Sequence, residues 1–148
     1  MLRRIFWLLV ILSACKQGQT VTKVKQGIEG SVIWREGNFM PQIGEKKEII
    51  IKPISREIHV YEPTRLTELR GQPPFFTQPR TRRIAIVQSD EKGKFYVELP
   101  EGTYSLFVKE EKGLYANLFD KDGTVYPVTV KNQAVTTIEI IIDYKSSY

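Results

Sequence analysis

The amino-acid sequence predicts an all-β fold, an antiparallel β-sandwich of seven or eight short strands. After residue 27, apolar and aromatic residues alternate with polar ones over most of the chain, and this period of two is typical of half-buried strands. Glycine, aspartate and proline interrupt the alternating segments at short intervals, as turns do in sandwiches. No segment shows a helical period over a useful length. A closed barrel is the alternative, because the pattern fixes neither strand number nor shear.

The expected strands follow one another along the chain. They cover residues 28–34, 56–62, 82–89, 94–99, 103–110, 114–119, 125–130 and 138–144. Gly93 and Gly102 lie in turns between strands, where a tight corner favours a positive φ angle. Tyr104 follows the second of these corners, and we expect its hydroxyl group to bond to the nearby backbone.

The same alternation predicts which side chains face outward. His59, the only histidine, falls on the polar side of its strand, so we expect it at the surface. The outward-facing positions also hold Tyr61, Tyr96, Phe107 and Ile141. Isolated apolar residues on a surface are ordinary, but a continuous patch of them favours a binding function.

Residues 1–14 have the pattern of a secretory signal peptide. Arg3 and Arg4 precede a short apolar run, and small residues follow it directly before Cys15. The run is too short to span a bilayer, which takes about 18–20 apolar residues. The Leu-Ser-Ala-Cys sequence that ends at Cys15 resembles the lipobox of bacterial lipoproteins. The resemblance implies cleavage before Cys15 and acylation of its thiol and of the new amino terminus; a plain secretory signal with an incidental cysteine is the alternative.

The segment after the predicted cleavage site is polar. Residues 15–26 show no apolar periodicity, and we expect them to be a lipidated tether for a single domain at residues 27–148. Lys16 follows the lipidation site, whereas an aspartate there often retains lipoproteins at the inner membrane of enteric bacteria. The residues after Lys16 also lack the acidic cluster that resembles a surface-export signal. By analogy we expect an anchor in the outer membrane and a domain that faces the periplasm.

Charge and cysteine content restrict the function and the source of stability. The formal net charge is +5, and part of this excess lies in the predicted signal peptide. A small positive charge and an envelope location together argue against nucleic-acid binding. Cys15 is the only cysteine, so no disulfide can form within the domain, and buried apolar surface must stabilise it.

Several short sequence motifs coincide with the expected strands and the turns between them. They are Ile28-x-Gly30-x-Val32, then Lys52-Pro53-Ile54 before Ile58-x-Val60, then a run from Ser89 to Val108 that contains Gly-x-Phe and Leu-Pro-x-Gly-x-Tyr. Over most of residues 27–143 they resemble the carboxypeptidase regulatory-like domain. The resemblance implies a transthyretin-like Greek-key sandwich of about seven antiparallel strands. The chain departs from that pattern at Ser55-Arg56, where the family usually has Gly-Ala, and in a longer first loop at residues 35–51.

Residues 63–79 form a long connection between two expected strands and are the main candidate for partner contact. They contain Arg65, Arg70, Phe75 and Phe76, and arginine and aromatic side chains are enriched at binding hot spots. Long connections are often functional. The alternative is that the two phenylalanine rings plug one end of the sandwich, with the arginines left as contact residues.

The residues that carry catalytic or metal chemistry are scarce. A zinc site needs three or four ligands, and a single histidine with no unmodified cysteine makes one improbable. Asp90, Asp120 and Asp122 could ligate calcium, but aspartate and glycine are also the usual residues of a hairpin turn. We therefore expect no cofactor and no metal.

These observations predict a non-enzymatic lipoprotein of the cell envelope. Its domain is expected to be a structural or protein-binding module, bound to the membrane through the lipid on Cys15 and to an envelope protein through the domain. The alternative is a carbohydrate-binding module that uses aromatic rings and the arginines of residues 63–79.

Overall fold

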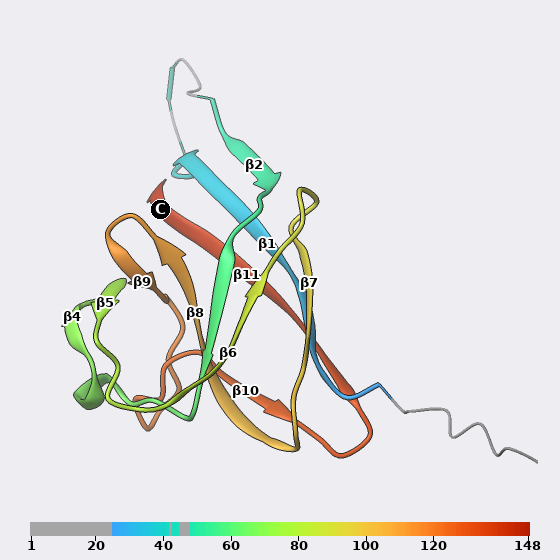
Figure 1. Ribbon diagram of the computed structural model, residues 1–148. Coiled ribbons are helices and arrows are strands. Elements are labelled where there is room, and N and C mark those ends of the chain that lie inside the picture. Colours follow the sequence, from blue (N-terminus) through green and yellow to red (C-terminus); the bar gives the residue numbers. More distant parts are fainter. Residues whose placement is uncertain (1–24, 42, 45–47) are drawn as a thin grey trace, which may run out of the picture.

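The computed structural model describes residues 25–41, 43–44 and 48–148, which form two β-sheets packed face to face (Figure 1). The strands are β1 (Gly27–Asn38), β2 (Ile50–Pro53), β3 (Glu57–Tyr61), β4 (Arg70–Gln72), β5 (Phe75–Thr77), β6 (Arg83–Gln88), β7 (Lys94–Glu98), β8 (Gly102–Glu110), β9 (Gly113–Tyr115), β10 (Pro127–Val130) and β11 (Val135–Ser147). One 3₁₀ turn, η1 (Leu66–Glu68), is the only helical element of the described chain. None of the described residues form a helix that is long and apolar enough to cross a bilayer. The predicted all-β sandwich is confirmed.

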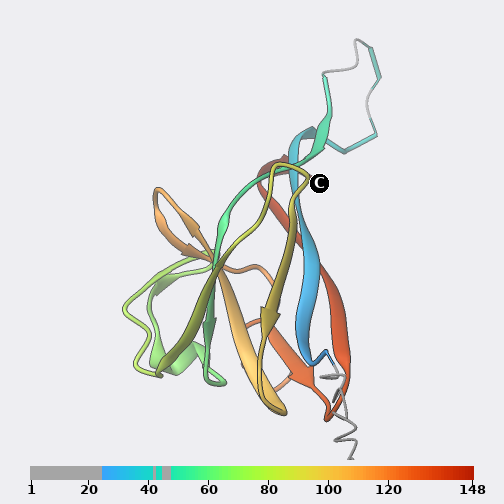
Figure 2. The ribbon, with the colours of Figure 1, turned by 45° about the vertical axis from the view of Figure 1, so that its right-hand side comes forward.

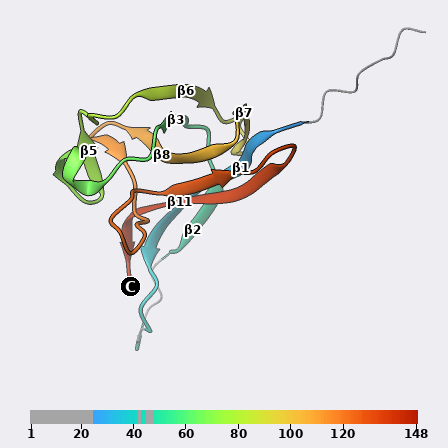
Figure 3. The ribbon, with the colours of Figure 1, turned by 90° about the horizontal axis from the view of Figure 1, so that it is seen from below.

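Two central strands organise the two sheets. In the first, here called the β1 sheet, β1 pairs with β11 on one side and with β7 and then β2 on the other. In the second, the β8 sheet, the order is β6, β3, β8, β9, β5, β4, and β10 pairs with the first half of β8. Figure 3 shows the two layers, with β6, β3 and β8 in one and β1, β11 and β2 in the other.

The first and last strands lie side by side and run in the same direction. Residues 27–34 of β1 pair in parallel with residues 135–142 of β11. The antiparallel expectation is wrong for this pair, although the other strand pairings of the described chain are antiparallel. Alternation fixes which face of a strand is buried, but it does not fix the direction of the neighbouring strand.

The core between the sheets consists mainly of apolar residues that alternate along paired strands. Apolar side chains are almost completely buried where β3 pairs with β8, and the same holds where β1 pairs with β11. They include Ile58, Val60, Leu106 and Val108 from the β8 sheet and Val32, Ile140 and Ile142 from the β1 sheet. Burial of each such side chain contributes about 1.5–3 kcal/mol.

The opposite face of the β8 sheet is also covered, which the sequence pattern did not predict. Phe107 is 1% exposed, and its ring packs edge to face with those of Tyr61 and Phe76, at centroid distances of 5.5 and 6.4 Å. Phe119 packs against Phe76 in the same way. His59 lies on this face and is 7% exposed. The expected outward positions of His59, Tyr61 and Phe107 are therefore wrong, because β5, which carries Phe76, and the loop that carries Phe119 pack over this face.

Residues 63–79 form regular structure that extends the β8 sheet. After η1, strands β4 and β5 pair with each other, and β5 pairs with β9. At the start of the segment, the buried Thr64 receives a hydrogen bond from Val125 N at its carbonyl group and donates its own N–H to Ser105 Oγ. Figure 2 shows that this segment lies at the edge of the β8 sheet, away from β1. The hydrogen bonds tie it to the sandwich.

The expected turn geometry is present. Gly93 has a φ angle of 72°, and a Cβ atom there would approach the carbonyl oxygen of Val32 to 2.5 Å. Gly102 has a φ angle of 156°. The hydroxyl group of Tyr104 donates to the carbonyl oxygen of Pro100 at 2.9 Å, which confirms the bond expected after this corner.

Strand bounds differ from the prediction in several places, and two of the differences bear on the cleft and on the aromatic cluster. β1 continues to Asn38 and pairs with β2, so part of the expected first loop at residues 35–51 is a two-stranded ribbon. The expected strand at 114–119 is reduced to β9, because the chain then turns away to bring Phe119 over Phe76. Both differences depend on contacts between residues that are far apart in the sequence.

We expect Phe76→Ala to lower the free energy of unfolding by about 3–5 kcal/mol, because it removes a buried ring that packs against Phe107 and Phe119 and leaves a cavity. Phe75→Ala is expected to cost less, since that ring is only partly buried. Urea unfolding of both variants measures the difference, with Thr77→Ala as an exposed control on the same strand. A Phe76→Ala variant of wild-type stability would contradict a supporting role for this cluster.

Candidate functional site

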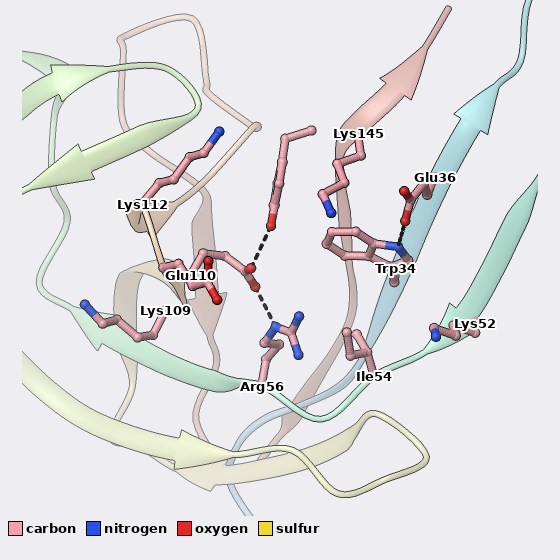
Figure 4. Close-up of a pocket in the computed structure, with 11 residues that line it drawn as sticks. Trp34, Glu36, Lys52, Ile54, Arg56, Lys109, Glu110, Lys112 and Lys145 are labelled. Atoms are coloured by element: carbon pink, nitrogen blue, oxygen red, sulfur yellow. Dashed lines mark hydrogen bonds and ion pairs between the residues drawn. The ribbon is translucent and has the colours of Figure 1, made fainter.

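A cleft of about 850 Å³ opens at one end of the sandwich. Its lining residues come from β1, β2, β11, the end of β8 with the turn that follows it, and the segment just before β3 (Figure 4). These parts of the chain are far apart in sequence and meet only because the two sheets pack together. The cleft has the size of a typical small-ligand or peptide-binding site.

A β-bulge in β11 shapes one wall of the cleft. Trp34 of β1 lies opposite Ile142, but Glu36 lies opposite Lys145, so the pairing shifts by one residue. Because of this extra residue, both Tyr144 and Lys145 line the cleft, whereas strict alternation would direct neighbours to opposite faces. The bulge therefore adds a second β11 side chain to the cleft.

The wall beside the bulge is aromatic and held in place. Trp34 is 7% exposed, and its indole N–H donates to a carboxylate oxygen of Glu36 at 3.0 Å. The ring of Tyr144 packs edge-on against Trp34, with centroids 5.2 Å apart. Phe75 packs against Tyr144 from behind at 4.9 Å. These ring contacts restrict the side-chain conformations of Trp34 and Tyr144.

A buried carboxylate lies at the centre of the site. Glu110 is 7% exposed, and its Oε1 accepts a hydrogen bond from Arg56 Nε at 2.6 Å. Its Oε2 accepts one from the hydroxyl group of Tyr144 at 2.9 Å. Figure 4 shows both bonds as dashed lines. Both carboxylate oxygens thus have partners, which a buried charge requires, and the network joins the two sheets.

Arg56 is positioned by the segment before β3. Its backbone N–H donates to Ser89 Oγ at 2.8 Å, and Ser55 Oγ donates to the carbonyl oxygen of Ser89 at 2.6 Å. The guanidinium group bonds to the Ser55 carbonyl through Nη1, at 3.0 Å. These bonds fix the position of the guanidinium group at the edge of the cleft.

Four lysines surround the network. Lys52 comes from β2, Lys109 and Lys112 from the end of β8 and its turn, and Lys145 from β11. The ammonium group of Lys145 lies 5.5 Å from the centre of the Trp34 ring. No ion pair among the residues that the structure describes joins these lysines to an acidic side chain. The lining holds five basic and three acidic residues, so the cleft is electropositive.

The hydroxyl group of Tyr144 stays neutral over a wide range of pH. Burial, reinforced by the hydrogen bond to the Glu110 carboxylate, raises the pKa of Tyr144 from 10.0 to about 12. The hydroxyl group therefore remains a donor to Glu110 at neutral pH.

The residues expected to contact a partner lie in different environments. Phe76 is 1% exposed in the aromatic cluster, in agreement with the plug alternative for that ring, and Phe75 supports the cleft wall from behind. Arg65 and Arg70 are exposed on the 63–79 segment, outside the cleft. Their role in partner contact stays a prediction. Sequence reasoning missed the cleft itself, because its lining residues come from segments that are far apart in the chain.

The acidic turns use their carboxylates to hold the backbone. Asp90 Oδ1 accepts hydrogen bonds from the N–H groups of Lys92 and Lys94, and Asp120 does the same for residues 122 and 124. The N–H of Thr124 is the main cause of the lowered pKa of Asp120. Within the described residues, no group of three or more His, Cys, Asp or Glu side chains is placed to hold a metal ion.

Cys15 and the rest of residues 1–24 lie outside the described residues, so the predicted lipid site has no structural account. Comparison of the chain with protein-family models, with curated proteins and with solved structures finds no significant match. The function is therefore argued from the cleft and from the sequence motifs.

The raised pKa of Tyr144 predicts a loss of stability at alkaline pH. The folded state favours the neutral hydroxyl group, so this contribution is complete below about pH 10 and disappears as the pH rises toward about 12. Tyr144→Phe has no ionisable hydroxyl group. Between about pH 8 and about pH 11, its free energy of unfolding should therefore fall less than that of the wild type. Equal losses, measured by urea unfolding at both pH values, would contradict this role for Tyr144.

Proposed function

We propose that the protein is a non-enzymatic lipoprotein of the bacterial cell envelope whose sandwich binds a partner protein in the cleft. The observation that carries the proposal is the Arg56–Glu110–Tyr144 network, which holds a charged recognition surface in one arrangement. A preorganised surface of this kind lowers the cost of ordering side chains when a partner binds. The sequence motifs add the anchor, through a lipid on Cys15.

The orientation of the domain suits this role. Gly27, where β1 begins, pairs with Val135, and the cleft residues Trp34 and Glu36 lie toward the other end of β1. Trp34 lies seven residues further along β1, about 23 Å away at about 3.3 Å per residue. A tether attached at Gly27 therefore joins the sandwich away from the cleft. In the proposed location, the outer membrane, the cleft faces the periplasm.

Carbohydrate binding is the alternative proposal and has less support. Sugar rings stack on exposed aromatic faces, and the aromatic residues of the cleft are Trp34 and Tyr144. Trp34 is 7% exposed, with Tyr144 packed against it and the cationic groups of Arg56 and Lys145 near its ring. The cleft therefore offers charge more readily than a stacking platform.

Lipidation is tested by Cys15→Ala in the full-length chain. The variant lacks the thiol that would carry the lipid, so we expect it to incorporate no labelled palmitate and to leave the membrane fraction. Ser13→Ala is the matched control, since Leu-Ala-Ala-Cys still fits the lipobox pattern, and it should remain labelled. Unchanged labelling of Cys15→Ala would overturn the anchor.

Partner binding in the cleft is tested by site-specific photocrosslinking in intact cells. Glu111 lines the cleft and is exposed, so a benzoylphenylalanine placed there should form a covalent adduct with a bound protein. Leu118, which is 50% exposed outside the cleft, is the control position. An adduct from position 111 and none from position 118 is expected. No adduct from position 111, or the same adduct from both, would contradict binding in the cleft.

A further inference from the structure

We infer that the cleft recognises an acidic, extended segment of its partner protein and that Arg56 is the anchoring residue. The inference rests on the proposed function, because it assigns the chemistry of the ligand in the same cleft. The inference is based on the distribution of charge around the Arg56–Glu110–Tyr144 network. It is also based on the N–H donors of Arg56 that have no partner within the described residues.

Two of the three acidic side chains of the cleft have partners within the protein, and the third, Glu111, is exposed. Glu36 accepts the indole N–H of Trp34, and Glu110 is bonded through both oxygens to Arg56 and Tyr144. The lysines have no such partner among the described residues. The surplus of positive charge is therefore not neutralised within the cleft, and a ligand that fills it gains most by supplying carboxylates.

Arg56 is prepared to receive one of these carboxylates. A guanidinium group has five N–H donors in a fixed plane, and here Nε is bonded to Glu110 and Nη1 to the Ser55 carbonyl. Nη2 has no hydrogen-bond partner among the described residues, and the side chain is 30% exposed. Because Glu110 and Ser55 fix the plane, binding of a carboxylate at the open edge requires little further ordering.

The positions of the lysines favour an extended peptide. Figure 4 shows Lys52 on one side of the cleft and Lys109 and Lys112 on the other, with Arg56 between them. An extended peptide directs successive side chains to opposite sides, about 3.4 Å apart along its axis. A segment rich in glutamate or aspartate therefore presents carboxylates to both walls at once.

The test is fluorescence anisotropy of labelled hexaglutamate with the full-length lipoprotein in detergent. Hexaglutamine of the same length is the neutral probe, and oligogalacturonate is the acidic carbohydrate probe. We expect hexaglutamate to bind and hexaglutamine not to bind at the same concentrations. Raising the salt from about 0.05 M to about 0.5 M should weaken hexaglutamate binding several-fold, since screening acts on exposed charges.

Substitutions in the cleft and outside it show which residues bind hexaglutamate. Lys52→Gln with Lys109→Gln should weaken hexaglutamate binding by about tenfold, since charge-assisted contacts are lost from both walls. Lys121→Gln with Lys131→Gln makes the same change in net charge outside the cleft and should leave binding within about twofold. Arg56→Lys keeps the charge but loses the planar donors, and we expect it to bind several-fold more weakly. Arg56→Gln alone would leave the buried Glu110 carboxylate without its cationic partner, so this substitution is made together with Glu110→Gln.

Each outcome decides between explanations. Equal binding of hexaglutamine, or equal loss in the cleft and control lysine variants, overturns the inference. Binding of oligogalacturonate without binding of hexaglutamate overturns it in favour of an acidic carbohydrate. An adduct from the photoreactive residue at position 111 does not depend on ligand charge. If that adduct forms while hexaglutamate fails to bind, the inference fails and the proposed function stands; if neither is seen, both fail.

Discussion

The parallel pairing of β1 with β11 is the constraint on which the rest of the structure depends. It joins the two ends of the domain along their full length, from Gly27 beside Val135 to Asn38 beside Ser147. Since β1 also pairs with β7 and β2, it is the central strand of its sheet. The apolar residues of these two strands form one side of the core. Without this pairing, neither the sheet nor the bulge beside the cleft would exist.

The bulge in β11 shapes the cleft. A single extra residue in β11 brings Lys145 to the cleft beside Tyr144, and Tyr144 completes the bonding of Glu110. Bulges are common next to functional sites, where they redirect a side chain. The hydroxyl group of Tyr144 joins the β1 sheet to a carboxylate on the β8 sheet. The same network that stabilises the end of the sandwich also positions Arg56.

The prediction from sequence succeeded where local chemistry decides structure. Alternation placed Ile58 and Val60 on one face of their strand, and both are in the core, while glycine identified the corner at Gly93. Alternation failed where one element covers another: the period of two assigns Phe107 to solvent, yet Phe76 of the distant strand β5 packs over it. The candidate site was missed for the same reason, since Arg56 and Glu110 are 54 residues apart and neither is unusual by itself.

The sequence alone determined the all-β class, the faces of the strands that form the main core and the turn chemistry, because these depend on residues within a few positions of one another. It also contains the lipobox-like motif at Cys15, from which a membrane anchor is proposed. Only the tertiary structure decided the direction of β11, the burial of the second face of the β8 sheet and the assembly of the cleft. Each of these depends on which distant segments meet, and a periodic pattern carries no information about the partner of a strand.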